Sequence, residues 1–226
     1  MPDRNSSTNG VAGESMTEVV ARYLREAINE GKFAPGAAVR QEAVAKELGV
    51  SRIPVREALR RLESEGLVVI RPNSGARVAV LDFEEYADIY KMRERLEPLA
   101  LSESIPRLTS SQIEDIERNL ERLLLLEGQP AAFLEADRQF HLSCYVGVPT
   151  TRLLKMIEGF WATTQRHRRA LLLTWTPEGY SWTNWEHRLI FDAIKNRNSR
   201  VGEEAIRMHI ERTRLHLASH TELFDR

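Results

Sequence analysis

Residues 35–78 read PGAAVRQEAVAKELGVSRIPVREALRRLESEGLVVIRPNSGARV, and this stretch decides the fold of the first part of the chain. Its apolar residues recur at helical spacing twice, first over 41–48 and then from Ser51 onwards. Gly49 stands between the two runs, and a residue without a Cβ adopts the left-handed conformation that ends a helix at little cost. The stretch therefore predicts two helices that are joined by a tight turn.

Pro54 supports the start of the second of these helices. It falls at the third helical position, where a backbone N–H would have no partner within the helix. Ser51 can cap the helix by accepting a hydrogen bond, and Gly66 closes it. The predicted buried stripe of this helix consists of Val55, Ala58, Leu59 and Leu62.

Two β-rich runs follow, LVVIR over 67–71 and ARVAV over 76–80, around the turn-forming PNSG. They predict a two-stranded hairpin. Upstream, apolar residues at helical spacing predict another helix, which stops at Gly31. Three short helices followed by a hairpin form a winged helix-turn-helix, whose third helix is shaped for the major groove of DNA.

The third helix carries a row of arginines. Arg52, Arg56 and Arg60 are spaced by four residues and therefore leave the same face of the helix. Guanidinium groups bond bidentately to the N7 and O6 atoms of guanine, and a helix N-terminus with Ser51 offers donors to a phosphate. The row therefore predicts a DNA-reading surface near the start of the helix.

The alternative is a solvated face, on which these arginines pair with Glu57 and Glu63 along the helix. The hairpin favours the DNA-binding interpretation. Arg71 and Arg77 flank its turn, where a wing can contact the backbone or the minor groove.

The composition limits the class of protein. Among 226 residues, 42% are hydrophobic, and 32 Lys and Arg stand against 33 Asp and Glu. This balance argues against intrinsic disorder and gives no whole-molecule charge argument for nucleic acid. The charge is nevertheless uneven. Residues 16–80 hold 11 basic and 8 acidic residues, a net of +3, and residues 81–226 hold 20 and 23, a net of −3.

Cys144 is the only cysteine, which excludes an intramolecular disulfide and any zinc site with several thiolates, and which points to a reducing cytoplasm. No apolar run approaches the roughly 20 residues that span a bilayer, and no signal core precedes the first helix, so neither membrane insertion nor export is predicted. Residues 1–15 read as a disordered tail, residues 16–80 as a winged helix-turn-helix domain, and residues 81–226 as a second domain.

The second domain shows helical patterns almost to its end. We expect helices over 83–104, 110–127, 131–146, 151–174, 183–197 and 199–220. The pair Thr183 and Glu186 has the spacing of a capping box and sets the start of the fifth helix. The fold class is therefore mainly α, with an antiparallel α-helical bundle behind the DNA-binding domain.

Four side chains of the bundle have the chemistry of metal ligands. Asp137 and His141 are four residues apart and share one helix face. His187 and His209 lie on the inner faces of the last two helices, and an antiparallel pair could bring them to a common level. Each histidine alone is more often a hydrogen-bonded core residue. Their joint occurrence with an inward aspartate makes a bound ion a serious alternative to four core residues.

The first domain resembles the DNA-binding domain of the GntR family of bacterial transcriptional regulators. The motifs SR, PVREAL, L.SEGL and P..G..V occur in order over about 65 residues. The resemblance implies that Arg52 and Arg56 contact bases or phosphates and that Gly75 forms the tip of the wing. Ile53 stands where threonine is usual, and Ser74 where the wing often carries arginine. The expected DNA-binding residues are Arg40, Ser51, Arg52, Pro54, Arg56, Arg60, Arg71, Ser74, Gly75 and Arg77.

Residues from about 83 to 220 resemble the FCD domain of the FadR-like branch of that family, through R..LEPLAL, D...FH, EH..I..AI and M.HI. In metal-binding members an Asp and three His hold a divalent ion. The resemblance implies the same role for Asp137, His141, His187 and His209, with Zn, Ni or Mn as the metal. It also implies that an effector carboxylate fills the remaining coordination positions.

Two further residues are candidates for effector binding. Arg93, at the start of the R..LE pattern, either pairs with an effector carboxylate or forms an ion pair with Glu97 or Glu94. His216 shares a face with His209 and either lines the pocket or packs. His167 and His220 have polar neighbours and are expected at the surface.

The sequence thus predicts a homodimeric transcriptional regulator that binds a palindromic operator in double-stranded DNA and senses a small organic acid. One alternative is a regulator that responds to the metal itself. The other is a metalloenzyme that the first domain tethers to DNA. Four ligands leave less room for a catalytic water, and no further inward carboxylate is evident to act as a general base, so the enzyme is disfavoured.

Overall fold

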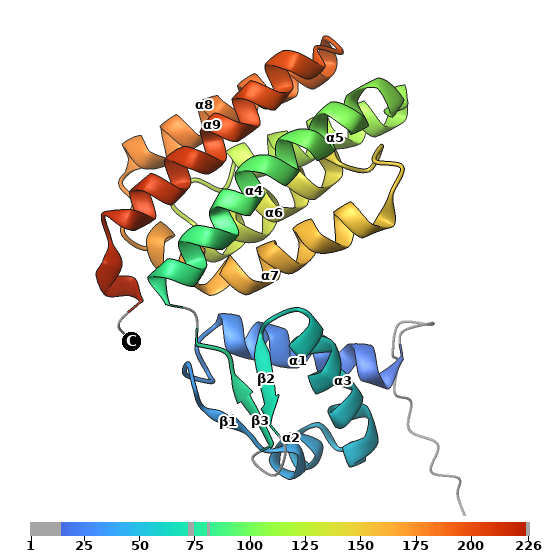
Figure 1. The fold of residues 1–226 in the computed structure, drawn as a ribbon, viewed down its shortest axis with the longest axis vertical. Helices are drawn as coiled ribbons and strands as arrows, with labels where there is room; N and C mark the ends of the chain where they lie inside the picture. Colours follow the sequence, from blue (N-terminus) through green and yellow to red (C-terminus); the bar gives the residue numbers. More distant parts are fainter. Residues whose placement is uncertain (1–14, 72–74, 81, 225–226) are drawn as a thin grey trace, which may run out of the picture. The chain divides into compact units, whose positions relative to one another are not determined.

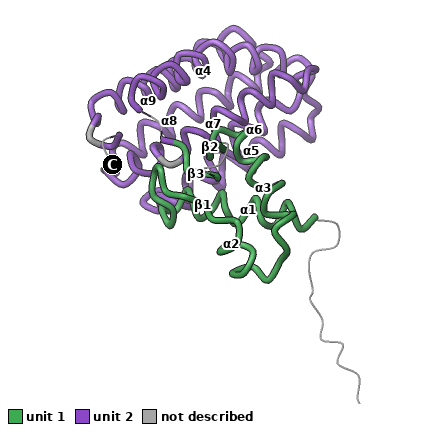
Figure 2. The backbone as a smooth tube through the Cα atoms, turned by 60° about the horizontal axis from the view of Figure 1, so that its bottom comes forward, with its two compact units in different colours: residues 1–79 green, residues 80–226 purple. Residues whose placement is uncertain are grey.

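The computed structural model describes residues 15–71, 75–80 and 82–224, without the side chains of Arg166 and Glu222. The expected tail therefore lies outside the described residues apart from Ser15, and so does Ser74. The chain divides into two compact units, residues 1–79 and 80–226 (Figure 2). The expectation of a mainly α-helical chain with a winged helix-turn-helix and a helical bundle is confirmed (Figure 1).

The described residues of the first unit form three helices, α1 Met16–Asn29, α2 Gln41–Leu48 and α3 Arg52–Ser64. Its sheet has three strands, β1 Ala38–Val39, β2 Val68–Arg71 and β3 Gly75–Val78, in the order β1-β3-β2 and antiparallel throughout. A two-stranded hairpin was predicted, so β1 corrects the prediction. Two residues are too few to show the alternation that marks a strand.

The helix-turn-helix follows from its sequence. Gly49 ends α2 with φ at 65°, in the left-handed region that favours glycine. Ser51 occupies the N-cap position of α3, but its side chain makes no capping hydrogen bond, which leaves the hydroxyl exposed. The four apolar residues predicted for the stripe of α3 are all buried and pack with α1 and the sheet. This core fixes α3 with its charged face outward.

The second unit is a bundle of α4 Phe83–Ser104, α5 Ser110–Leu124, α6 Pro130–Cys144, α7 Thr151–Leu172, α8 Pro177–Lys195 and α9 Ser199–Ala218. Short 3-10 turns follow α4 and α9, at Ile105–Arg107 and Thr221–Leu223. Helices α4 and α9 lie side by side on the face toward the viewer in Figure 1, and α6, α7 and α8 enclose the core with them. Large buried rings, Trp161, Tyr86, Tyr90 and Phe140 among them, fill this core.

Helix α8 begins six residues earlier than predicted. Pro177 is its first residue, with Thr176 at the N-cap, and Thr183 is buried within the helix. The predicted capping box of Thr183 and Glu186 is therefore wrong. A proline in the first turn is itself a start signal, and it outweighs the turn character of the nearby glycine. No described helix is long and apolar enough to cross a membrane.

Candidate functional site

Three helices of the bundle bring the four predicted ligands together. Asp137 and His141 come from α6, His187 from α8 and His209 from α9, and all four are buried. Each offers one ligand atom, and these atoms lie within 4.8 Å of one another. Nε2 of His141 is 3.2 Å from Nε2 of His187, and Oδ1 of Asp137 is 3.0 Å from the latter atom. The arrangement is a compact N/O ligand set.

The protonation states suit a cation. Burial lowers the pKa of His141 and that of His187, so both imidazoles are neutral and keep a lone pair for an ion. Burial alone would raise the pKa of Asp137, but the Arg168 guanidinium and the nearby imidazoles hold it well below its usual range. Its Oδ1 is buried and has no hydrogen-bond partner among the described residues. An ionised oxygen left in this way fits a divalent cation.

A second layer of polar residues orients His209. Its Nδ1 lies 2.8 Å from Oε2 of Glu186, and Nη2 of Arg212 donates to the same carboxylate oxygen at 2.7 Å. Burial opposes ionisation of Glu186, yet the bonds to His209 and Arg212 lower its pKa to about 2. A carboxylate on Nδ1 fixes the proton there and leaves Nε2 as the ligand atom, as in many metal sites.

A small cavity adjoins two of the four predicted ligands, Asp137 and His209, with room for roughly one water molecule. Asp137, His209, Arg168 and two threonines contribute polar atoms to its wall. The full lining consists of Phe133, Asp137, Arg168, Leu171, Leu172, Trp175, Thr183, His209 and Thr213. Nη1 of Arg168 is buried and makes no hydrogen bond to any residue that the structure describes. The cavity therefore joins the ligand set to an available cationic donor.

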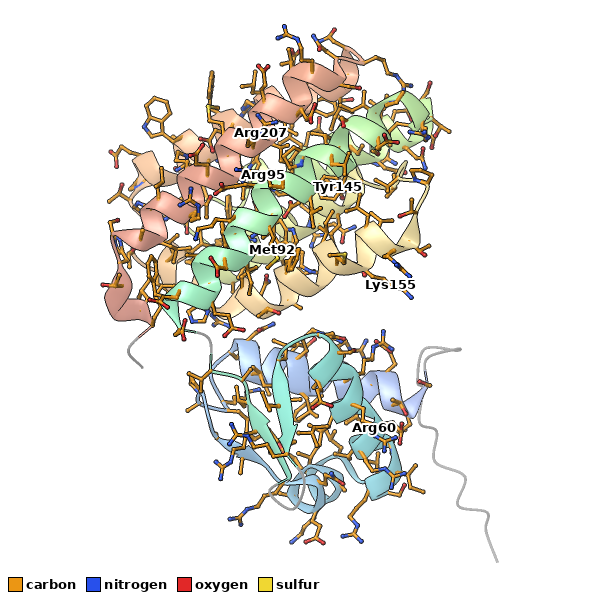
Figure 3. All side chains as sticks on the ribbon, in the orientation of Figure 1. Arg60, Met92, Arg95, Tyr145, Lys155 and Arg207 are labelled. Atoms are coloured by element: carbon orange, nitrogen blue, oxygen red, sulfur yellow. The ribbon has the colours of Figure 1, made fainter. Side chains whose placement is uncertain are left out.

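The first unit presents its arginines to solvent. The side chains of Arg52, Arg56 and Arg60 are each more than half exposed; Arg60 is labelled in Figure 3. Arg52 contacts Glu42, and the other two contact Glu57 at 3.4 and 3.5 Å. The pairs with Glu57 that the alternative interpretation expected are thus present, whereas the Glu63 carboxylate accepts a hydrogen bond from the backbone N–H of Ile70. Exposed pairs of this kind contribute only about 0–1 kcal/mol, so they leave the arginines free to exchange partners.

The rest of the predicted DNA surface lies on the same unit. Ser51, Arg40 and Arg71 are exposed, and Pro54 is partly buried in the first turn of α3. Nη1 of Arg77 donates to the carbonyl oxygen of Gly36 at 2.9 Å, which ties β3 to the loop before β1. Gly75 begins β3 with φ at 71°. Sequence reasoning did not single out Ile53 for contact, yet it is 64% exposed in the first turn of α3, beside the arginines.

Comparison with known proteins matches both units to families. Residues 16–78 match the family of bacterial regulatory proteins named gntR, and residues 88–212 match the FCD domain. A regulator from an unstable DNA locus of Streptomyces ambofaciens is 31% identical over 207 residues, 85% of this chain and 84% of the relative. The chain belongs to the GntR family of bacterial regulatory proteins.

Two other comparisons agree with this assignment. The transcriptional repressor RspR of Escherichia coli K12 is 27% identical over 200 residues, 88% of this chain and 87% of that protein. The solved structure of McbR/YncC from E. coli superposes with a TM-score of 0.78 at 24% identity and covers 89% of this chain and 96% of that one. This GntR protein is therefore a DNA-binding transcriptional regulator with an FCD domain, and the metalloenzyme alternative falls.

Arg93 of the FCD domain lies in a buried ion pair. Its Nε is 2.5 Å from Oε1 of Glu97, and the hydroxyl of Tyr145 donates to the other oxygen of that glutamate at 2.7 Å. The ion-pair alternative of the sequence analysis is thus the one present. Arg93 does not line the cavity beside the ligands, although its Nη1 makes no hydrogen bond to a described residue.

Other histidines of the FCD domain occupy different settings. His216 is partly buried, and its ring centroid lies 6.4 Å from that of Trp175, which lines the cavity. His216 therefore contacts a lining residue but does not line the cavity itself. His167 was expected at the surface but is buried, stacked on Phe224 at 4.6 Å and against Tyr86. The prediction failed because the C-terminal segment covers a polar stretch of α7.

The expectation that the bundle holds no further inward carboxylate was also wrong. Glu186 and Glu97 are both buried, at 4% and 0% exposure. Glu186 was missed because it had been assigned to a helix start. Arg168 was missed within the polar run QRHRR, although it follows the buried Trp161 by seven residues and so shares its face. Cys144 is buried, and burial raises the pKa of its thiol.

Proposed function

We propose that the operator affinity of this regulator is controlled by a small organic acid that binds beside a divalent transition metal. Asp137, His141, His187 and His209 would hold the ion. The observation that carries this proposal is the ionised, unpartnered Oδ1 of Asp137 next to neutral imidazoles. Three nitrogens and one oxygen suit Zn, Ni or Mn, and a six-coordinate ion would keep two positions open.

The acid would bind through its carboxylate. When bound, the metal supplies positive charge and open coordination positions for that group. Arg168 supports this role, because its buried Nη1 lacks a partner among the described side chains and the residue lines the cavity. Arg93, with its own unpartnered Nη1, and His216, behind Trp175, remain candidates that need a shift of the wall. A carboxylate contact does not by itself distinguish lactate-like acids from sugar acids, dicarboxylates or aromatic acids.

The size of the cavity supports a linked conformational change. A space for about one water does not accommodate an organic acid unless a neighbouring side chain moves. Binding that requires such movement shifts the population of arrangements within the FCD domain. Operator affinity would then change by the same coupling free energy, typically about 1–3 kcal/mol.

The DNA surface would consist of the first turns of α3 with the wing. Arg52, Arg56 and Arg60 would contact guanine edges and phosphates, and Ile53 would contact a thymine methyl group. The exposure of a large apolar side chain between arginines supports this assignment. The remaining contacts would come from Arg40, Ser51, Pro54, Arg71, Ser74, Gly75 and Arg77.

A homodimer would match a palindromic operator. The outer face of α4 and α9 supports this proposal (Figure 3), since it exposes apolar side chains among charges of both signs. The apolar members are Met92, Leu99, Met208 and Leu215. Light scattering tests the face: Leu99→Asp should yield monomers, whereas Trp182→Asp on the exposed side of α8 should not.

The name of RspR supports repression as the mode of action, and a DNA partner together with a single reduced thiol supports a cytoplasmic location. A second candidate function is a regulator that responds to the metal alone. The small cavity favours it, because the site as described admits little beside an ion and a water.

One titration separates these functions. Operator fragments selected from a random pool are bound by the purified protein, first with Zn, Ni or Mn alone and then with metal and a panel of organic acids. A change of affinity that requires an acid supports the proposal, and a change with metal alone supports the second candidate. A protein that shows no sequence preference under any of these conditions contradicts both.

A further inference from the structure

The two carboxylate oxygens of Asp137 have different neighbours. Oδ2 accepts a hydrogen bond from Nη2 of Arg168. Oδ1 lies 3.0 Å from Nε2 of His187 and 3.7 Å from Nε2 of His141, and no described residue donates a hydrogen bond to it. Only one of the two oxygens therefore faces the point where the imidazoles converge.

Arg168 is held in place by aromatic packing. Its guanidinium carbon lies 4.2 Å from the ring centroid of Trp161, a residue with no exposed surface. The guanidinium of Arg93 lies 4.4 Å from the same centroid and is fixed in turn by Glu97. Arg168 cannot swing away from Asp137 without leaving this stack, so the carboxylate keeps one orientation.

We infer that Arg168 is a positioning residue of the metal site, which restricts Asp137 to binding an ion through Oδ1 alone. The inference rests on the proposed metal function. A free carboxylate can bind an ion through one oxygen or through both, and the second mode takes a coordination position that an acid could use. Occupation of Oδ2 by Arg168 removes that choice.

The charges support orientation as the role of Arg168. Among the predicted ligands only Asp137 brings a negative charge, and the guanidinium of Arg168 beside it offsets that charge. A cation beside a cation site weakens the attraction for the ion. A site built for affinity alone would therefore omit this arginine, whereas a site that must keep open positions benefits from it.

Cobalt(II) tests the inference, because its visible absorption spectrum reports coordination number and geometry. The full-length protein and the variants R168M and R168K are loaded with Co²⁺, and affinity is measured by calorimetry. R168M should shift the spectrum, because Asp137 is then free to bind through both oxygens, and it should not weaken affinity, because a cation beside the site is removed. R168K should restore the wild-type spectrum, since an ammonium group still donates to Oδ2.

R214M serves as the matched control. Arg214 is a partly buried arginine of the bundle that is ion-paired as Arg168 is, but its partner is Glu94, which is not a predicted ligand. The Co²⁺ absorption spectrum of R214M should equal that of the wild-type protein. If circular dichroism shows that R168M does not fold, R168Q takes its place, because the shorter side chain does not span the same distance to Asp137.

The outcomes separate the inference from the function on which it depends. If the wild-type protein binds no Co²⁺, the metal function and the inference fail together. If the wild type binds Co²⁺ and R168M or R168Q gives the same spectrum, the inference alone is overturned. A shift in R168M that R168K reverses supports both.

Discussion

The two units of this regulator hold their functional side chains in opposite ways. The arginines of α3 are more than half exposed and rest on weak surface pairs. The ligand residues of the FCD domain are at most 4% exposed and depend on buried partners from three helices. We therefore expect that a surface residue can be exchanged with little effect on folding, whereas each residue of the buried set should affect both stability and metal binding.

The largest effect on stability is expected from Asp137→Ala. It leaves the buried guanidinium of Arg168 without its carboxylate, and breaking a buried pair in this way costs about 3–5 kcal/mol. Chemical denaturation measures the loss. Asp88→Ala removes an exposed carboxylate paired with Lys91 and should change the free energy of unfolding by less than about 0.5 kcal/mol. Equal effects would remove the contrast between buried and exposed pairs.

A second test addresses binding in the buried set. His187→Ala should lose most of the bound metal, because it removes one of four ligand atoms. Elemental analysis after dialysis measures the occupancy. His220→Ala, outside the ligand set, should keep wild-type occupancy. Full occupancy of the His187 variant would exclude that residue as a ligand.

Exposed arginines should show the reverse behaviour. Arg52→Ala and Arg56→Ala are each expected to weaken operator binding by about 1–3 kcal/mol while the free energy of unfolding stays within about 0.5 kcal/mol of wild type. Fluorescence anisotropy at physiological salt and thermal denaturation measure the two quantities. Unchanged operator binding would refute the recognition-helix assignment, and a large loss of stability would show that these side chains are not interchangeable surface groups.

Ile53 gives the smallest expected effect. Ile53→Ala should weaken operator binding by about 1 kcal/mol, since it removes an apolar contact of limited area. Replacing the contacted thymine by uracil should produce a similar loss in the wild type and no further loss in the variant. Additive losses would show that Ile53 does not touch that methyl group.

The same contrast explains what the sequence could predict. Local signals such as Gly49, Pro54 and the stripe of α3 determine their own surroundings, so α2 and the turn were placed correctly. Strand β1 was not predicted, because its pairing with β3 depends on a tertiary contact and not on a pattern within its two residues. Helix α4 was predicted with its observed bounds, while α8 was shortened by a misplaced cap.

The candidate site was only partly accessible from sequence. The spacing of Asp137 and His141 and the inward positions of His187 and His209 pointed to ligands, and the family resemblance implied the same four residues. The partners that orient them, Glu186 and Arg168, lie on other helices than the residues they contact, 23 and 31 positions away in the chain. Charged residues within polar runs resemble surface residues until packing brings them inside, so no local pattern marked their roles.

The buried thiol of Cys144 has a practical consequence. It is the only cysteine of the chain and ends α6, the helix that supplies two of the ligand residues, and it is fully shielded in the folded domain. A thiol reagent can reach it only when the bundle opens, so the rate of labelling measures how often the bundle opens. An ion or acid that stabilises the closed bundle would slow the labelling of Cys144. The measurement would need no engineered cysteine.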